Sequence, residues 1–305
     1  MKKTTFGRTG LQVSPLGFGA APIGYLKTDQ DRIATILNLL LDQGVNLIDT
    51  AASYKGSEEA IGAAIGHRRD EYVLVSKCGS EVPQAQGKAW SAELITNTVH
   101  ASLKRLRTDR LDVMLLHSCD LQTLQKGEAL GALVKAREAG KIRFAGYSGD
   151  NDTVAWAAAQ PDIAVIETSV SVVDQNNVDV VLPVTRKHNV GVLAKRPIAN
   201  SAWRGPEAFS GIYPDYIRPY WERFQKLPLA PRDLGFSGEK DWAEIALRFT
   251  LSMPGVHTAI IGTTNPDNDR ANIAVANKGP LPEDAVKKIR EAFKKAAAGS
   301  WPGLT

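Results

Sequence analysis

The chain has 305 residues, of which 43% are hydrophobic and 23% are charged, and its formal net charge is +4. These values are typical of a soluble globular protein, and the small, scattered positive charge argues against a nucleic-acid partner. No apolar stretch approaches the length of about 20 residues that a membrane-spanning helix needs. The N-terminal residues 1–19 begin with positive charge but lack the apolar segment of a signal peptide. We therefore expect a cytoplasmic protein with neither a membrane nor a nucleic-acid partner.

Short apolar segments alternate with longer amphipathic ones along the chain. The segments expected to form strands cover residues 13–19, 45–49, 72–77, 111–117, 143–148, 163–167, 190–195 and 257–262. The clearest helical patterns cover residues 30–44, 57–66, 93–106 and 244–253, where apolar residues recur every three or four positions. Gly44, Gly66 and Gly140 follow helical patterns, where left-handed C-caps are expected.

This alternation predicts an α/β fold, an eight-stranded parallel (β/α)8 TIM barrel that occupies residues 1–305 as one domain. A doubly wound sheet is the rival architecture, but it usually carries G-x-G-x-x-G after its first strand. Residues 17–24, GFGAAPIG, lack that spacing. Residues 2–14 contain two short extended stretches that flank Gly7 and Gly10, which predicts an N-terminal β-hairpin at the bottom of the barrel.

Two expected connections are unusually long and lie on the C-terminal face of the barrel. Residues 78–90 follow the third strand, and residues 196–238 follow the seventh. The second connection is rich in aromatic residues, namely Trp203, Phe209, Tyr213, Tyr216, Tyr220, Trp221 and Phe224. Long loops in compact domains often serve function, so we expect a pocket wall or lid here. The alternative is a small helix that only packs against the barrel.

Four ionisable residues lie at or just after the expected strands. Asp49 and Tyr54 follow the second strand, Lys77 ends the third, and His117 ends the fourth. In a parallel barrel these strand ends meet on the face where active sites are assembled. A nearby ammonium lowers the pKa of a phenol, so this set predicts a proton donor. The hydride of a carbonyl reduction must then come from a nicotinamide cofactor, because side chains cannot supply it.

Over nearly its whole length the chain resembles the aldo-keto reductase family. The resemblance rests on residues 6–19, FGRTGLQVSPLGFG, on residues 46–62, NLIDTAASYKGSEEAIG, and on the Lys of VSK and the His of LLH. It implies that Tyr54 is the general acid, that Asp49 and Lys77 tune it, and that His117 orients a small carbonyl substrate. It also implies NADPH bound across the C-terminal face, with NADH or dual use as the alternative.

The reaction implied by the resemblance is reduction of an aldehyde or ketone. The alternatives are a sugar or polyol dehydrogenase that works in the oxidative direction, and a cofactor-sensing binding protein.

Oligomeric state is left open, with a monomer favoured. No metal site is expected, because the five histidines show no paired ligand spacing. Cys78 and Cys119 are expected as reduced core residues, and a redox-sensitive pair near the site is the alternative.

The residues that the resemblance assigns to cofactor binding depart from the family pattern at several positions. Ser148 matches, but Gly149 replaces the usual Asn, Glu167 the usual Gln, and Lys195 a frequent aromatic residue. Because their strands are adjacent, we expect Glu167 and Lys195 to form an ion pair beneath or beside the nicotinamide. The alternative is that Lys195 points to solvent or to the long loop. The expected cofactor-binding residues are Gly19, Ser148, Glu167, Lys195, Arg196, Gly262, Thr263, Thr264, Asn268, Arg270 and Asn272.

The segment after the last strand resembles the part of the family that binds the adenosine 2′-phosphate. Two positions that are often basic in the family carry Gly262 and Asn268 here, and Arg270 is the nearby cation. A phosphate needs fixed donors and preferably a cation. Hydroxyl groups, amides at the start of a helix and Arg270 are therefore expected to hold it.

Overall fold

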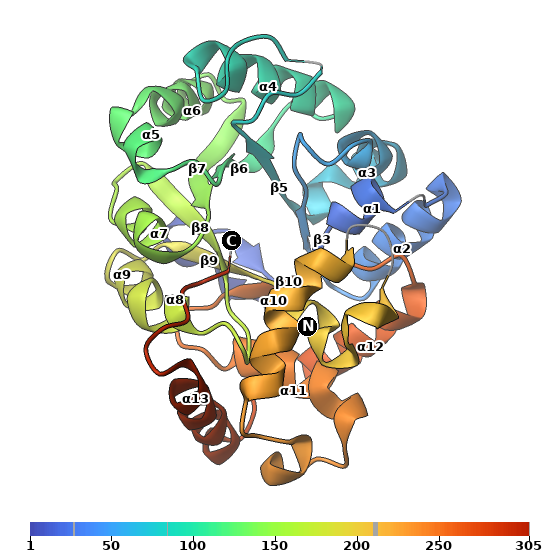
Figure 1. Ribbon diagram of the computed structural model, residues 1–305. Coiled ribbons are helices and arrows are strands. Elements are labelled where there is room, and N and C mark those ends of the chain that lie inside the picture. The colour runs from blue at the N-terminus through green and yellow to red at the C-terminus, as the bar shows by residue number, and fades with distance from the viewer. Residues whose placement is uncertain (27, 84, 210–212, 305) are drawn as a thin grey trace.

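The computed structural model describes residues 1–26, 28–83, 85–209 and 213–304 and contains a closed barrel of parallel strands (Figure 1). The strands follow one another around the barrel in the order β10-β3-β4-β5-β6-β7-β8-β9. Their bounds are β3 Leu16–Gly19, β4 Leu47–Asp49, β5 Val73–Cys78, β6 Leu111–His117, β7 Ile142–Ser148, β8 Ile163–Ser169, β9 Gly191–Lys195 and β10 Thr258–Ile261. The predicted barrel and all eight predicted strands are confirmed.

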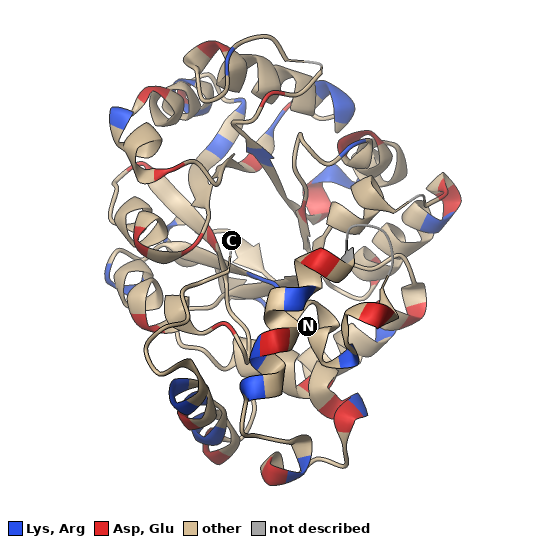
Figure 2. Cartoon of the chain, in the orientation of Figure 1, with Lys and Arg blue, Asp and Glu red and all other residues tan. Residues whose placement is uncertain are grey.

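Helices surround the barrel. Their bounds are α1 Ala21–Tyr25, α2 Gln30–Asp42, α3 Ser57–Ile65, α4 Ala92–Arg105, α5 Leu121–Lys126, α6 Glu128–Glu138, α7 Asn151–Ala158, α8 Asn176–Val180, α9 Leu182–Lys187, α10 Tyr213–Lys226, α11 Trp242–Leu251, α12 Pro266–Asn277 and α13 Glu283–Ala297. Short 3-10 helices add η1 Gly7–Thr9, η2 Gly66–Glu71, η3 Ala199–Arg204, η4 Pro206–Ala208, η5 Pro231–Leu234 and η6 Glu239–Asp241. Lys and Arg alternate with Asp and Glu over these outer helices (Figure 2).

Helix starts and ends follow local signals in the sequence. The side chain of Ser91 accepts a hydrogen bond from the amide of Leu94 and so caps α4. Gly44 and Gly140 adopt left-handed backbone with φ of 82° and 72°, as predicted. The prediction for Gly66 is wrong, because its φ is −55° and the chain continues into η2.

The two-residue period of the strands decides which side chains face the barrel interior. One buried cluster fills the barrel and includes Leu47, Val75, Leu115, Val165 and Leu193. A second cluster lies between strands and helices and contains the alternate residues of the same strands, such as Ile48, Leu74, Leu116, Ile166 and Val192. Because side chains alternate along a strand, the residue two positions after an inward-facing residue also faces inward. The last side chain of several strands therefore lies inside the barrel mouth.

The N-terminal hairpin closes the opposite end of the barrel. Its strands β1 (Thr4–Thr5) and β2 (Gln12–Val13) pair antiparallel. Phe6 is fully buried and belongs to the cluster inside the barrel. Its ring packs edge-on against His257 at 5.7 Å between centroids. The predicted hairpin is confirmed, and it fills the bottom of the barrel with apolar side chains.

The long connection after β9 folds into η3, η4, α10, η5 and η6. Phe224 of α10 packs between Trp203 and Trp242, with ring centroids 5.9 and 5.3 Å apart. Tyr220 is buried, whereas Tyr216 is 42% exposed. This part of the connection therefore packs on the barrel, and Tyr216 and Tyr220 accept hydrogen bonds from Arg196.

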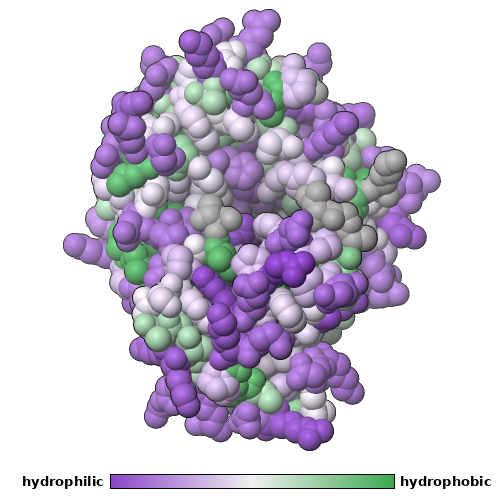
Figure 3. All heavy atoms as spheres, in the orientation of Figure 1, coloured by the Kyte–Doolittle hydropathy of each residue, from purple (hydrophilic) through white to green (hydrophobic). Residues whose placement is uncertain are grey.

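Residues 300–304 cross the C-terminal face of the barrel (Figure 1). The carbonyl of Leu304 accepts hydrogen bonds from Ser169 and Arg196, and the amide of Leu304 donates to Asp174 at 3.0 Å. Arg223 of α10 donates to the carbonyl of Pro302 at 2.7 Å. This face is largely hydrophilic in Figure 3, with a shallow recess near its centre. None of the helices in the described ranges is long and apolar enough to cross a membrane.

Candidate functional site

The four residues singled out by the sequence meet at the mouth of the barrel. Asp49 ends β4, Lys77 is the fifth residue of β5, and His117 ends β6. Tyr54 lies in the turn after β4, where its amide donates to the carbonyl of Ala51 at 3.0 Å. The turn brings the phenol ring back over the strand ends, within reach of the other three side chains.

Lys77 and Asp49 form a buried ion pair. The Lys77 Nζ lies 2.6 Å from both carboxylate oxygens of Asp49 and donates to the carbonyl of Thr50 at 3.0 Å. The Lys77 side chain is 0% exposed and that of Asp49 is 2% exposed. Burial acts to lower the pKa of Lys77, but the adjacent carboxylates outweigh it and hold that pKa above its usual value. Lys77 is therefore a permanent cation.

Glu167 is a second carboxylate on the same lysine. Its Oε2 lies 3.2 Å from the Lys77 Nζ, and its side chain is 4% exposed. The predicted ion pair between Glu167 and Lys195 is therefore wrong. In the strand register Glu167 is level with Leu193, whereas Lys195 is level with Ser169, so the two charges are offset along adjacent strands. Glu167 instead reaches across the barrel mouth to Lys77.

The electrostatics of the cluster act on Asp49. Burial and the negative charge of Glu167 raise the pKa of Asp49 to about 8, although Lys77 lowers it. Two carboxyl groups that share one ammonium in a buried site cannot both ionise without cost. Asp49 is therefore harder to ionise than an ordinary aspartate.

Tyr54 lies beside this cluster and keeps its proton. The Lys77 Nζ lies 5.4 Å from the centroid of the Tyr54 ring. Lys77 lowers the pKa of the phenol, as predicted, but burial outweighs it and the carboxylates of Asp49 and Glu167 act in the same direction as burial. The net pKa of Tyr54 lies above its usual value, so the predicted net lowering is wrong for this arrangement.

His117 faces Tyr54 across the barrel mouth. Their rings meet edge to face, with centroids 6.0 Å apart. Burial and the positive charges of Lys77 and Lys195 lower the pKa of His117 to about 3. The imidazole is therefore neutral at physiological pH, with one N–H that can donate and one nitrogen that can accept.

Lys195 pairs with Asp150, a residue that the sequence pattern did not predict as part of the site. The Lys195 Nζ lies 3.0 Å from Asp150 Oδ2. The other carboxylate oxygen of Asp150 accepts from the Thr168 hydroxyl, the Ser169 amide and the Asn177 amide group at 3.1, 2.7 and 2.8 Å. The signal was present, because Asp150 comes two residues after the end of a strand. Lys195 is thus held at the mouth and is 12% exposed.

Ser148 ends β7, the strand between those of His117 and Glu167, and Gly149 follows it. Ser148 is level with His117 on one side and with Glu167 on the other, and it is 1% exposed. A Cβ on Gly149 would lie 2.7 Å from the ring of Tyr147, which is fixed by a hydrogen bond to the carbonyl of Cys119. The glycine that replaces the family asparagine is therefore required by packing.

The segment after β10 carries the remaining expected cofactor contacts. Thr263 Oγ1 accepts from the amide of Asn265 and from the side chain of Asn268, both at 3.1 Å. Arg270 is exposed and lies 3.5 Å from Asp267. A Cβ on Gly262 would meet the carbonyl oxygen of Gly19 at 2.1 Å, so the close approach of β3 and β10 requires glycine there. Thr264 and Asn272 are partly exposed on the same segment.

The loop after β9 has features that suit a polar ligand. Three consecutive residues, Ala199, Asn200 and Ser201, adopt left-handed backbone with φ of 45°, 55° and 57°. The side-chain nitrogen of Asn200 is buried and has no hydrogen-bond partner among the residues that the structure describes. Arg196 is fixed here by the hydroxyls of Tyr216 and Tyr220 at 2.6 and 2.8 Å. An amide and a guanidinium are donors of the kind that bind phosphate groups.

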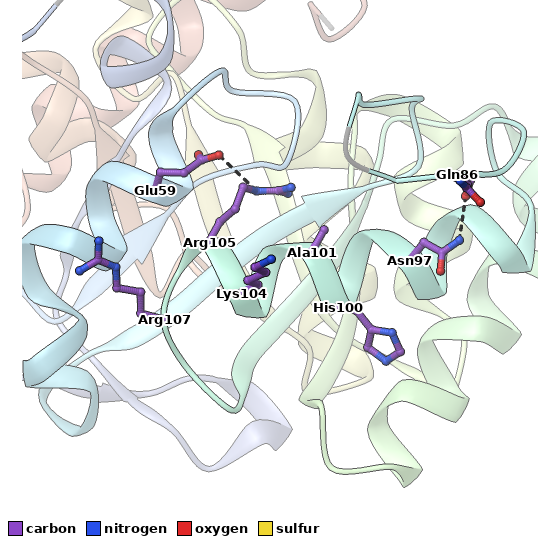
Figure 4. A pocket seen from close by; sticks show the side chains of 8 residues that line it. All are labelled: Glu59, Gln86, Asn97, His100, Ala101, Lys104, Arg105 and Arg107. Carbon is purple, nitrogen blue, oxygen red and sulfur yellow. Dashed lines mark hydrogen bonds and ion pairs between the residues drawn. The ribbon is translucent and has the colours of Figure 1, made fainter.

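Two other features do not belong to this site. A groove of about 740 Å³ lies on the outside of the barrel against α4 and carries Lys104, Arg105 and Arg107 (Figure 4), but the Arg105 guanidinium is paired with Glu58 and Glu59.

Within the described ranges no cluster of His, Cys, Asp and Glu suits a metal. The thiols of Cys78 and Cys119 are free and buried, and burial raises the pKa of Cys119 to about 12, so both behave as core residues.

Comparison with known proteins agrees with this geometry. The model of the Aldo/keto reductase family matches residues 15–294. The chain is 27% identical to the uncharacterized oxidoreductase YqkF of Bacillus subtilis, covering 97% of each protein, and 26% identical to L-galactose dehydrogenase of Arabidopsis thaliana, covering 97% of this chain and 95% of that protein. The structure superimposes on the holo form of the aldo-keto reductase AKR11C1 of Bacillus halodurans with a TM-score of 0.78 and 25% identity, covering 96% of each chain. The chain therefore belongs to the aldo/keto reductase family.

Proposed function

We propose that the protein reduces an aldehyde or ketone to the alcohol with a nicotinamide cofactor, and that Tyr54 donates the proton. The observation that carries the proposal is the buried contact of Lys77 with Asp49 at 2.6 Å, beneath the Tyr54 ring and opposite a neutral His117. The Tyr54 ring has the Lys77 ammonium at 5.4 Å from its centroid and the neutral imidazole of His117 at 6.0 Å between centroids. This set can polarise a carbonyl and protonate its oxygen.

Each side chain has a distinct part in the proposed reaction. The N–H of His117 donates to the carbonyl oxygen and orients it toward Tyr54. Tyr54 then gives its hydroxyl proton to that oxygen as negative charge develops there. Lys77 stabilises the resulting phenolate, and Asp49 fixes the position of Lys77. The bound cofactor supplies the hydride to the carbonyl carbon.

The cofactor contacts are part of the proposal. Ser148 faces the mouth at the level of His117, and the loop with Arg196 and Asn200 suits the pyrophosphate. The segment from Thr263 to Asn272 suits the adenosine end. Among the described residues 262–272, Arg270 supplies the positive charge, and it lies beside Asp267. We propose NADPH as the cofactor, with NADH or dual use as the alternative.

A protonated Tyr54 suits the reductive direction of the reaction. Because its pKa lies above the usual value, the phenol is protonated at neutral pH and is ready to donate. Oxidation of an alcohol needs the opposite state, a phenolate that accepts a proton. The similarity to an L-galactose dehydrogenase favours a sugar as the substrate of this second candidate, which runs the same chemistry in reverse.

The test combines cofactor binding with turnover. Fluorescence titration with NADPH and NADH is carried out on the wild type and on Tyr54→Phe, and reduction of a panel of aldehydes is followed by loss of NAD(P)H absorbance. We expect both proteins to bind cofactor equally and turnover to fall by about 10²-fold or more in the variant. Equal turnover in both proteins would remove Tyr54 from the mechanism. Failure of both cofactors to bind would remove the proposed function.

A further inference from the structure

Glu167 adds a second carboxyl group to the buried pair of Asp49 and Lys77. Its carboxylate and that of Asp49 approach the same ammonium, at 3.2 and 2.6 Å. All three side chains are at most 4% exposed, so water does not screen them. Two potential negative charges therefore oppose one positive charge beneath Tyr54.

The surroundings of Glu167 contain no competing cation at contact distance among the described residues. On β7 its neighbour in register is Ser148, and on β9 it is the apolar Leu193. The nearest cation on β9 is Lys195, which is held by Asp150. The charged and titratable groups that face Glu167 are thus Lys77 and Asp49, with Tyr54 and His117 above them.

We propose that Glu167 is a positioning residue that governs proton donation by Tyr54 through Lys77. This inference rests on the proposed function of the site. The Glu167 carboxylate contacts the Lys77 ammonium together with that of Asp49 and offsets the positive charge that otherwise stabilises the phenolate. Tyr54 then remains a phenol over a wide pH range and releases its proton only when substrate and cofactor change the balance of charge.

A glutamine at this position would fill the same volume without the charge. Lys77 and Asp49 would then form a neutral pair, and the attraction of the ammonium for a phenolate would no longer be offset. With Lys77 at 5.4 Å from the ring and Glu167 at 3.2 Å from Lys77, the carboxylate lies within about 9 Å of the ring centroid. A unit charge at that distance in a protein interior shifts a titration by about one pH unit or more.

The experiment follows the Tyr54 ring by NMR in protein labelled with carbon-13 at the tyrosine ζ position, without cofactor. Tyr54→Phe assigns the resonance. We expect Glu167→Gln to move the titration midpoint of Tyr54 to lower pH by about one pH unit or more, and Glu167→Asp to restore most of the wild-type behaviour. In turnover, the basic limb of the kcat/KM profile of Glu167→Gln should move in the same direction.

Glu58→Gln is the matched control. Glu58 is equally buried, but it bonds to Ser76 and Arg105 and does not act on Tyr54. An unchanged Tyr54 titration in Glu167→Gln, or an equal change in Glu58→Gln, would overturn the inference. Because the NMR titration needs neither substrate nor cofactor, its outcome is separate from that of the proposed activity.

Discussion

Asp269 gives a stability prediction whose sign and size come directly from the structure. It lies in the first turn of α12, is 2% exposed, and its Oδ2 has no hydrogen-bond partner within the described ranges. Burial raises the pKa of this carboxyl from 3.8 to about 7, and Arg270 opposes this only in part. Ionising Asp269 in the folded protein is therefore unfavourable.

The pH window follows from the direction of this change. Below the unfolded pKa of 3.8 a carboxyl of this kind is protonated in both states and does not lower the free energy of unfolding. The free energy of unfolding falls as pH rises above 3.8, and the loss is complete above a pH of about 7. Linkage over this interval makes the loss in free energy of unfolding that Asp269 causes about 2 to 3 kcal/mol larger at pH 8 than at pH 5. Asp269→Asn, which cannot ionise, should remove this pH-dependent part.

The assay is urea unfolding of the wild type and Asp269→Asn at pH 5 and pH 8. We expect the variant to gain about 2 to 3 kcal/mol in free energy of unfolding over the wild type between the two pH values. Asp267→Asn is the control, since its carboxylate lies on the same helix and is 87% exposed. If wild type and Asp269→Asn keep the same difference at both pH values, Asp269 is not an isolated buried acid and the reasoning fails.

Two further substitutions test the packing and charge of the site. Lys77→Met leaves the carboxyl groups of Asp49 and Glu167 buried without their cation, so we expect a loss of about 3 to 5 kcal/mol in free energy of unfolding at pH 8. The loss should be smaller at pH 5, where Asp49 gains a proton, and equal losses at the two pH values would contradict the charge argument. Gly149→Ala places a Cβ at 2.7 Å from the Tyr147 ring, so we expect a loss of about 1 to 3 kcal/mol. The double variant with Tyr147→Ala should lack this clash, and a full additive loss in a double-mutant cycle would rule out the clash as the cause.

The sequence predicted the barrel because its signals are local and repeated. Each strand is a short apolar run, and the alternation with helices requires parallel strands. Since parallel strands end on one face, Asp49, Lys77 and His117 were expected together, and the structure places them together. The N-terminal hairpin was equally visible from the glycines at 7 and 10.

Other features depended on distances across the barrel, which the sequence does not contain. The sequence pattern did not predict Asp150 as a site residue, because three hydrogen bonds from residues 168, 169 and 177 hold its carboxylate in place. Gly149 and Gly262 looked like lost cofactor contacts, whereas close packing against Tyr147 and Gly19 requires them to be glycine. Such contacts join strands and loops that are remote in sequence.

The sequence by itself determined the fold, the family resemblance and the residues that gather at the barrel mouth, because hydrophobic period and chain order fix these. Only the tertiary structure decided the pairing of the charges and the protonated state of Tyr54. Strand register separates Glu167 from Lys195, and Glu167 contacts Lys77 instead. Burial of Tyr54 raises the pKa of its phenol, and the carboxylates of Asp49 and Glu167 add to this effect. The physical reason is that electrostatic effects depend on distance and solvent exposure, which arise only when the barrel closes.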